Sequence, residues 1–107
     1  MHKVLAIVRP QFSSGFLLAG CDVFESEDSL EVEKKVKSLL NTQEYALVII
    51  DEKLVKGFSP YTKNLIFEST EPVFIEIGLE GTSDEHIIRE IESLARDALG
   101  YAIKIKV

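Results

Sequence analysis

The stretch from Tyr45 to Asp51 constrains the fold of this 107-residue chain more than any other. It reads Tyr-Ala-Leu-Val-Ile-Ile-Asp, a short apolar run that is rich in β-branched residues. A strand with one face in water alternates apolar and polar residues, whereas a continuous apolar run is typical of a strand covered on both faces. Such strands lie in the middle of parallel sheets, with helices packed above and below. The run therefore predicts the central strand of an α/β domain.

Strand and helix patterns alternate along the rest of the chain. Apolar segments at 4–8, 23–24 and 73–77 predict three more strands, with 23–24 at a sheet edge. Helical patterns cover 16–19, 30–40, 52–56, 61–68 and 84–99, and a short tail strand is expected at 101–107. This alternation implies right-handed crossovers and a mostly parallel four-stranded sheet in the order 2-1-3-4, as in flavodoxin-like and receiver-like folds. We expect one domain over 1–107, with an α/β core in 1–80 and a long C-terminal helix in 83–100.

Polar residues just before several helical patterns are candidate N-caps. They are Ser13 or Ser14, one of Ser26, Asp28 and Ser29, Asp51 for the turn after the central strand, and Ser83 or Asp84. Within 30–40, one apolar stripe is expected to face the sheet; it comprises Leu30, Val32, Val36, Leu39 and Leu40.

Composition excludes several classes of partner. The net charge is −6, and the densest basic group, Lys34, Lys35 and Lys37, is interleaved with Glu31 and Glu33, so a nucleic-acid surface is not expected. The single cysteine, Cys21, allows no internal disulfide and fits a reducing compartment. No apolar run approaches the roughly 20 residues of a membrane span, and a strand begins almost at the N-terminus, leaving no room for a signal peptide. We expect a soluble, cytoplasmic protein.

The search for catalytic chemistry leaves two alternatives. Asp51 ends the central strand, where a receiver domain carries its phosphoacceptor, but Arg9-Pro10-Gln11 stands where that site needs carboxylates for magnesium. Cys21 with His86 is a conceivable nucleophile pair, although a lone cysteine among apolar residues is usually inert. No residue set predicts a catalytic, cofactor or metal site.

Four stretches together resemble one known family. Residues 15–20 read Gly-Phe-Leu-Leu-Ala-Gly, and residues 45–52 contain the central strand with the turn after it. Residues 72–77 read Pro-Val-Phe-Ile-Glu-Ile, and Leu-Gly-Tyr at 99–101 is followed by Ile-Lys at 103–104. This order of motifs resembles the F subunits of the V-type (archaeal and bacterial A/V-type) ATPases. The break at 57–60 departs from the family's more continuous helix, so the surface from Glu52 to Ser69 cannot be carried over.

The resemblance implies a non-catalytic rotor subunit of the central stalk. Such a subunit binds the coiled-coil shaft (the D subunit), turns inside the ring of A and B subunits, and helps couple ATP hydrolysis or synthesis to proton or sodium transport. It would bind no cofactor, and it would meet the membrane only through the assembled complex.

Two groups of apolar residues are candidates for the partner interface. Phe16, Leu17 and Leu18 belong either to the core or to a contact with the shaft. The stripe on the last helix either covers the sheet or docks on another subunit; it comprises Ile87, Ile91, Leu94 and Ala98. Replacing Ile91 and Leu94 by serine is expected to weaken assembly more than it lowers thermal stability.

Overall fold

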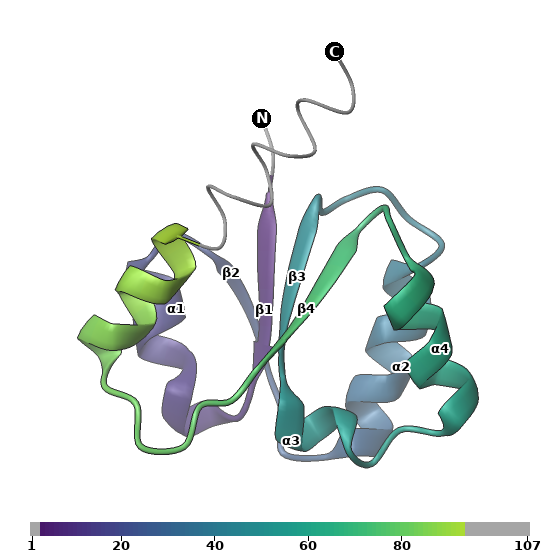
Figure 1. The fold of residues 1–107 in the computed structure, drawn as a ribbon, viewed down its shortest axis with the longest axis horizontal. Coiled ribbons are helices and arrows are strands. Elements are labelled where there is room, and N and C mark those ends of the chain that lie inside the picture. Colours follow the sequence, from purple (N-terminus) through teal and green to yellow (C-terminus); the bar gives the residue numbers. More distant parts are fainter. Residues whose placement is uncertain (1–2, 94–107) are drawn as a thin grey trace.

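The computed structural model describes residues 3–93 as a four-stranded parallel sheet between two layers of helices (Figure 1). The strands are β1 (Val4–Val8), β2 (Asp22–Glu25), β3 (Leu47–Asp51) and β4 (Val73–Ile77). The labelled helices are η1 (Pro10–Phe12), α1 (Ser13–Leu18), α2 (Ser29–Leu39), α3 (Glu52–Val55) and α4 (Pro60–Glu68), and residues 84–93 are also helical. The strand order β2-β1-β3-β4 confirms the predicted order.

The central position of β3 explains its apolar run. All five of its residues are buried, and it pairs with β1 on one side and β4 on the other. Because helices cover both faces of the sheet, neither face of β3 meets water, and the period-two alternation of a half-exposed strand is absent. The short β2 lies at one edge as predicted, and β4 forms the other edge.

Alternate residues of the strands supply two separate cores. On one face, Leu5, Ile7, Val48 and Ile50 pack with α2, α3 and α4. On the other face, Ala6, Val8, Leu47 and Ile49 pack with Phe16 of α1 and with Ile87 and Ile91 of the last helix. Figure 1 shows these two helical layers on opposite sides of the sheet.

Helix α2 begins at one of the predicted caps and buries most of the predicted stripe. Asp28 is its N-cap, and the carboxylate accepts a 2.9 Å hydrogen bond from the Leu30 amide. Val32, Val36 and Leu39 face the core, whereas Leu30 is exposed, so its assignment to the stripe was wrong. Glu33 is buried instead, because its carboxylate faces the junction between α3 and α4.

The break at 57–60 has a polar and a steric cause. Ser59 caps α4, and its hydroxyl and amide both donate to Glu33 Oε2, at 2.9 and 3.2 Å. The Thr62 hydroxyl donates to the same oxygen at 2.5 Å. A Cβ at Gly57 would lie 2.5 Å from Ser29 Cβ, so only glycine lets the chain pass α2 this closely.

The cap predicted for α1 is absent, whereas the cap predicted for the last helix is present. Neither Ser13 nor Ser14 caps α1: its N-cap is Phe12, which has no side-chain cap, because η1 already leads into the helix. Gly20 follows α1 with a φ of +92°, a conformation that glycine adopts without strain. The Ser83 hydroxyl accepts a hydrogen bond from the His86 amide at 3.2 Å, confirming a cap there. The predicted end of this helix and the tail strand at 101–107 lie outside the described residues.

Candidate protein-binding surface

Helix α1 turns one apolar side chain inward and two outward. Phe16 is fully buried in the core, so its side chain is covered in this structure. Leu17 and Leu18 follow it on the solvent side, 56% and 71% exposed. A Cβ on Gly15 would come within 3.0 Å of Ile87 Cγ2, so the opposite side of α1 packs closely on the last helix. Of the three apolar residues predicted here, Leu17 and Leu18 are the ones that a partner can reach.

The apolar stripe of the last helix covers the sheet over its described part. Ile87 and Ile91 are 1% and 2% exposed and belong to the same core as Phe16. This arrangement matches the first of the two alternatives for these isoleucines. A serine in place of Ile91 would also lower stability substantially, because it would place a hydroxyl and a cavity in this core. Leu94 and Ala98 fall beyond the described residues, and their part in an interface stays a prediction.

Four charged side chains form a network of ion pairs at the carboxyl ends of the strands. Arg9 Nε lies 2.6 Å from Asp51 Oδ2, and another guanidinium nitrogen of Arg9 lies 2.6 Å from Glu80 Oε1. The Lys53 ammonium reaches the same Glu80 oxygen at 3.2 Å. The hydrogen bond from Arg9 holds the pKa of Glu80 below its usual value, and the one to Asp51 raises the pKa of Arg9. The network joins β1, β3 and the loop after β4.

Asp51 has a structural role at this edge. Its side chain is fully buried, and Oδ1 accepts a 3.0 Å hydrogen bond from the Lys53 amide, which confirms the predicted cap of the turn after β3. The other oxygen is paired with Arg9. The carboxylate is thus fully covered, whereas a receiver-like acceptor must meet its phosphodonor, and the geometry does not favour that alternative.

Cys21 and His86 do not form a reactive pair. Cys21 is buried, and burial raises the pKa of its thiol to about 11, so the thiol stays protonated near neutral pH and little of the reactive thiolate forms. His86 is exposed, with its Nε2 atom 3.8 Å from Glu90 Oε1. Within residues 3–93, no cluster of three His, Cys, Asp or Glu side chains is arranged to hold a metal ion. In the same part of the chain, no helix is both long and apolar enough to span a bilayer.

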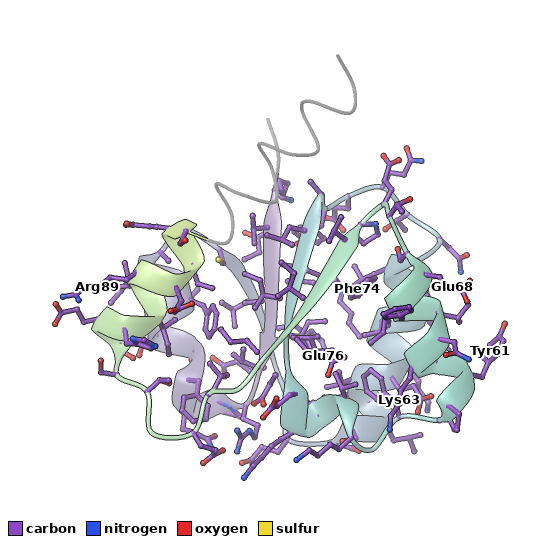
Figure 2. All side chains as sticks on the ribbon, viewed as in Figure 1. Tyr61, Lys63, Glu68, Phe74, Glu76 and Arg89 are labelled. Carbon is purple, nitrogen blue, oxygen red and sulfur yellow. The ribbon has the colours of Figure 1, made fainter. Side chains whose placement is uncertain are left out.

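A second surface, on α4 and β4, was not predicted from the sequence. Phe67 of α4 is 88% exposed, and Tyr61 of the same helix is 68% exposed. Figure 2 shows Tyr61 projecting away from the body of the protein, with Phe74 and Glu76 between β4 and α4. Helical spacing was the available signal: once Ile66 is assigned to the core, Phe67 points about 100° away from it.

Comparison with known proteins gives the same relationship from sequence and from structure. A family model described as ATP synthase (F/14-kDa) subunit matches residues 4–95. The F subunit of the A-type ATP synthase of Archaeoglobus fulgidus is 33% identical over 101 residues, covering 94% of this chain and 95% of the relative. The F subunit of the V-type ATP synthase of Thermus thermophilus is 28% identical over 101 residues, covering 92% and 97%.

A solved structure agrees with these relatives. The crystal structure of the F subunit of the V-type ATP synthase from Archaeoglobus fulgidus superimposes with a TM-score of 0.64 at 31% identity. It covers 72% of this chain and 98% of the solved chain. With the family model matching most of the sequence, this chain belongs to the family of ATP synthase (F/14-kDa) subunits.

Proposed function

We propose that this chain is the non-catalytic F subunit in the central stalk of a rotary A/V-type ATPase. In this role it binds the shaft (the D subunit), contacts the A or B subunits of the head, and helps couple ATP hydrolysis or synthesis to proton or sodium transport. It works in the cytoplasm and reaches the membrane only through the assembled complex. The observation that carries the proposal is the family match across residues 4–95.

The outer side of α1 supports a contact with the shaft. Leu17 and Leu18 are adjacent exposed leucines on a six-residue helix whose other side is fixed in the core by Phe16. An apolar pair on a rigid support loses little conformational freedom when a partner covers it. Covering one such leucine stabilises a complex by about 1.5–3 kcal/mol, which corresponds to roughly tenfold or more in affinity.

Co-expression with a tagged shaft subunit tests this proposal. The wild-type chain is expected to elute with the shaft as a one-to-one complex. Leu18→Asp is expected to reduce the recovered complex strongly, because the charge would be buried in an apolar contact. The matched control is Leu30→Asp, since Leu30 is also an exposed leucine, 62% accessible, but lies on α2 in the other layer.

The outcomes separate the proposal from its details. Both variants should melt close to the wild type, because neither leucine is part of the core. Equal recovery of Leu18→Asp and Leu30→Asp would place the shaft contact elsewhere on the chain. Failure of the wild-type chain to bind the shaft would overturn the proposed function itself.

A further inference from the structure

The outer edge of β4 carries backbone groups that no described strand pairs. β4 ends the sheet, with β3 as its one neighbour among residues 3–93. The Val73 amide donates to the Ala46 carbonyl at 3.0 Å, so the backbone of Val73, Ile75 and Ile77 faces β3. Because these directions alternate along a strand, the N–H and C=O groups of Phe74 and Glu76 point outward. These outward groups form what we call the β4 edge.

The opposite edge of the sheet is protected by charge. β2 has four residues and is bounded by the exposed carboxylates of Asp22 and Glu25. Asp22 accepts a 2.8 Å hydrogen bond from the Tyr45 hydroxyl and lies 3.4 Å from the Lys3 ammonium. Short edge strands and charged side chains oppose the addition of another strand. β4 has five residues and a single charge, at Glu76, so it is the more open edge.

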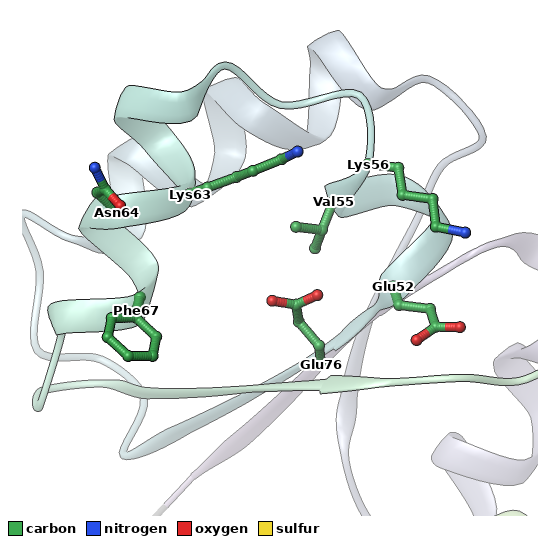
Figure 3. A pocket seen from close by; sticks show the side chains of 7 residues that line it. All are labelled: Glu52, Val55, Lys56, Lys63, Asn64, Phe67 and Glu76. Carbon is green, nitrogen blue, oxygen red and sulfur yellow. The ribbon is translucent and has the colours of Figure 1, made fainter.

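A hollow lies beside the β4 edge, on the side of α4. Its volume is about 370 Å³, and it exists because α3 ends at Val55 and α4 begins only at Pro60. Figure 3 shows the side chains around it, which are those of Glu52, Val55, Lys56, Lys63, Asn64, Phe67 and Glu76. A strand added to β4 would place alternate side chains on this side of the sheet, toward the hollow.

Glu76 gives the β4 side of the hollow a preference for a cation. It points from β4 into the hollow (Figure 3), and no Lys, Arg or His nitrogen among the described residues lies within 4.0 Å of its carboxylate. The exposed ring of Phe67 stands at the rim, where it can receive a cation on its face. Lys56 and Lys63 lie on the helical walls, so an incoming cation fits best on the β4 side, next to Glu76.

The described helix after β4 lies on the face of the sheet opposite to α3 and α4. The helix at 84–93 packs in the same layer as α1, as the shared core of Ile87 and Phe16 shows. A parallel strand that joined β4 from this layer would need a left-handed crossover, a hand that parallel sheets almost never use. A strand from another protein has no such restriction.

We propose that the β4 edge binds an extended segment of a partner protein as an added strand, with a Lys or Arg of that segment in the hollow beside Glu76. The added strand pairs with the outward groups of Phe74 and Glu76, and its apolar residues pack against Phe67 and Phe74. The choice of partner rests on the proposed function: the segment belongs to another subunit of the ATPase.

Amide hydrogen exchange tests the proposal at single residues. The full chain is compared alone and bound to the catalytic head with its shaft, purified without this subunit, and exchange is read by mass spectrometry with electron-transfer fragmentation. The Phe74 and Glu76 amides should exchange at least roughly tenfold more slowly in the complex, because they gain hydrogen bonds. The Val23 and Glu25 amides, which face outward on β2 since the Ser26 amide bonds to Val8, are the internal control and should not change.

Two variants at one position separate backbone pairing from charge. Glu76→Pro removes the carboxylate and also the outward donor, a change that edge strands tolerate, and it is expected to lower affinity for the head–shaft complex by about tenfold or more. Glu25→Pro makes the same change at the other edge and should bind as the wild type does. Glu76→Lys reverses the charge but keeps the backbone donor. It should therefore weaken binding, while the Phe74 amide stays protected from exchange in the complex that forms. This variant also tests the proposal if Glu76→Pro does not fold.

The results distinguish this inference from the proposed function. A chain that binds the head–shaft complex with unchanged exchange at Phe74 and Glu76 would overturn the inference and leave the proposed function standing. A chain that does not bind at all would overturn both. Self-association of the free chain that Glu76→Pro abolishes would assign the β4 edge to a second copy and contradict the proposal.

Discussion

Replacing Ile91 by alanine measures whether the last helix belongs to the core. Ile91 is 2% exposed and packs with Ile87 and Phe16 against the sheet. The change removes three carbons, worth about 2.4 kcal/mol of lost burial at about 0.8 kcal/mol each, and the residual cavity brings the loss to about 3 kcal/mol. For a chain of this length, the unfolding entropy converts that loss into a fall in Tm of roughly 13 °C.

Thermal and urea unfolding followed by circular dichroism give this value. Glu92→Ala is the matched control, because Glu92 is the next residue of the same helix and is exposed. It is expected to change the free energy of unfolding by less than about 0.5 kcal/mol. A Tm for Ile91→Ala within a few degrees of the wild type, together with lost binding to partner subunits, would show that this residue serves an interface and would refute the packing argument.

Three further predictions concern buried polar groups. Hydrogen bonds, first from Thr62 and then from the Ser59 amide, hold the pKa of Glu33 below its usual value. The stability that they contribute is therefore present above about pH 4.5 and is lost as the pH falls through the lowered pKa. Glu33→Gln should flatten the acid side of the curve of stability against pH, and an unchanged curve would contradict the assignment. Asp51→Ala leaves the guanidinium of Arg9 without its nearest carboxylate and should cost about 3 kcal/mol in urea unfolding; a loss below about 1 kcal/mol would contradict the structural role of the pair. Since burial raises the pKa of Cys21 to about 11, iodoacetamide should alkylate the folded protein at pH 8 roughly 100-fold more slowly than the urea-unfolded chain, and equal rates would refute its burial.

The sequence predicted the sheet well because each strand has a local signal. The run from Tyr45 to Asp51 identified β3, and the alternation of strands and helices determined the order of the sheet, since right-handed crossovers leave few other arrangements. Asp51 was predicted as a cap, and Asp28 was one of three candidates with Ser26 and Ser29, because a carboxylate at the start of a helix accepts hydrogen bonds from neighbouring amides. Features that depend on residues close together in the sequence could therefore be predicted.

Features that depend on distant residues were not predicted. Glu33 is buried because Ser59 and Thr62, 26 and 29 residues further along the chain, donate to it, and a hydrophobic pattern carries no sign of that partnership. Leu30 was assigned to the apolar stripe from its spacing to the other apolar residues of the helix, although it lies at the exposed start of α2. Phe67 was missed for the converse reason, because an aromatic residue in a helix is usually counted as core.

The two candidate surfaces could be predicted from the sequence only in part. The family resemblance of residues 15–20 indicated α1 as a candidate interface. Only the structure shows that Leu17 and Leu18 are exposed and that Phe16 is buried. The hollow beside Glu76 is lined by α3 and α4, in the segment whose surface the family resemblance did not predict. A break in a helix is readable from Gly57 and Pro60, but the space that it leaves above a neighbouring strand is not.

Isothermal titration of the purified chain tests the central claim, which is that this protein acts by binding other subunits and performs no chemistry itself. The chain is titrated in parallel with the purified shaft and with magnesium–ATP under the same conditions. The account predicts saturable one-to-one binding to the shaft and no binding heat with magnesium–ATP. Saturable binding of magnesium–ATP by a chain that gives no heat with the shaft would contradict it.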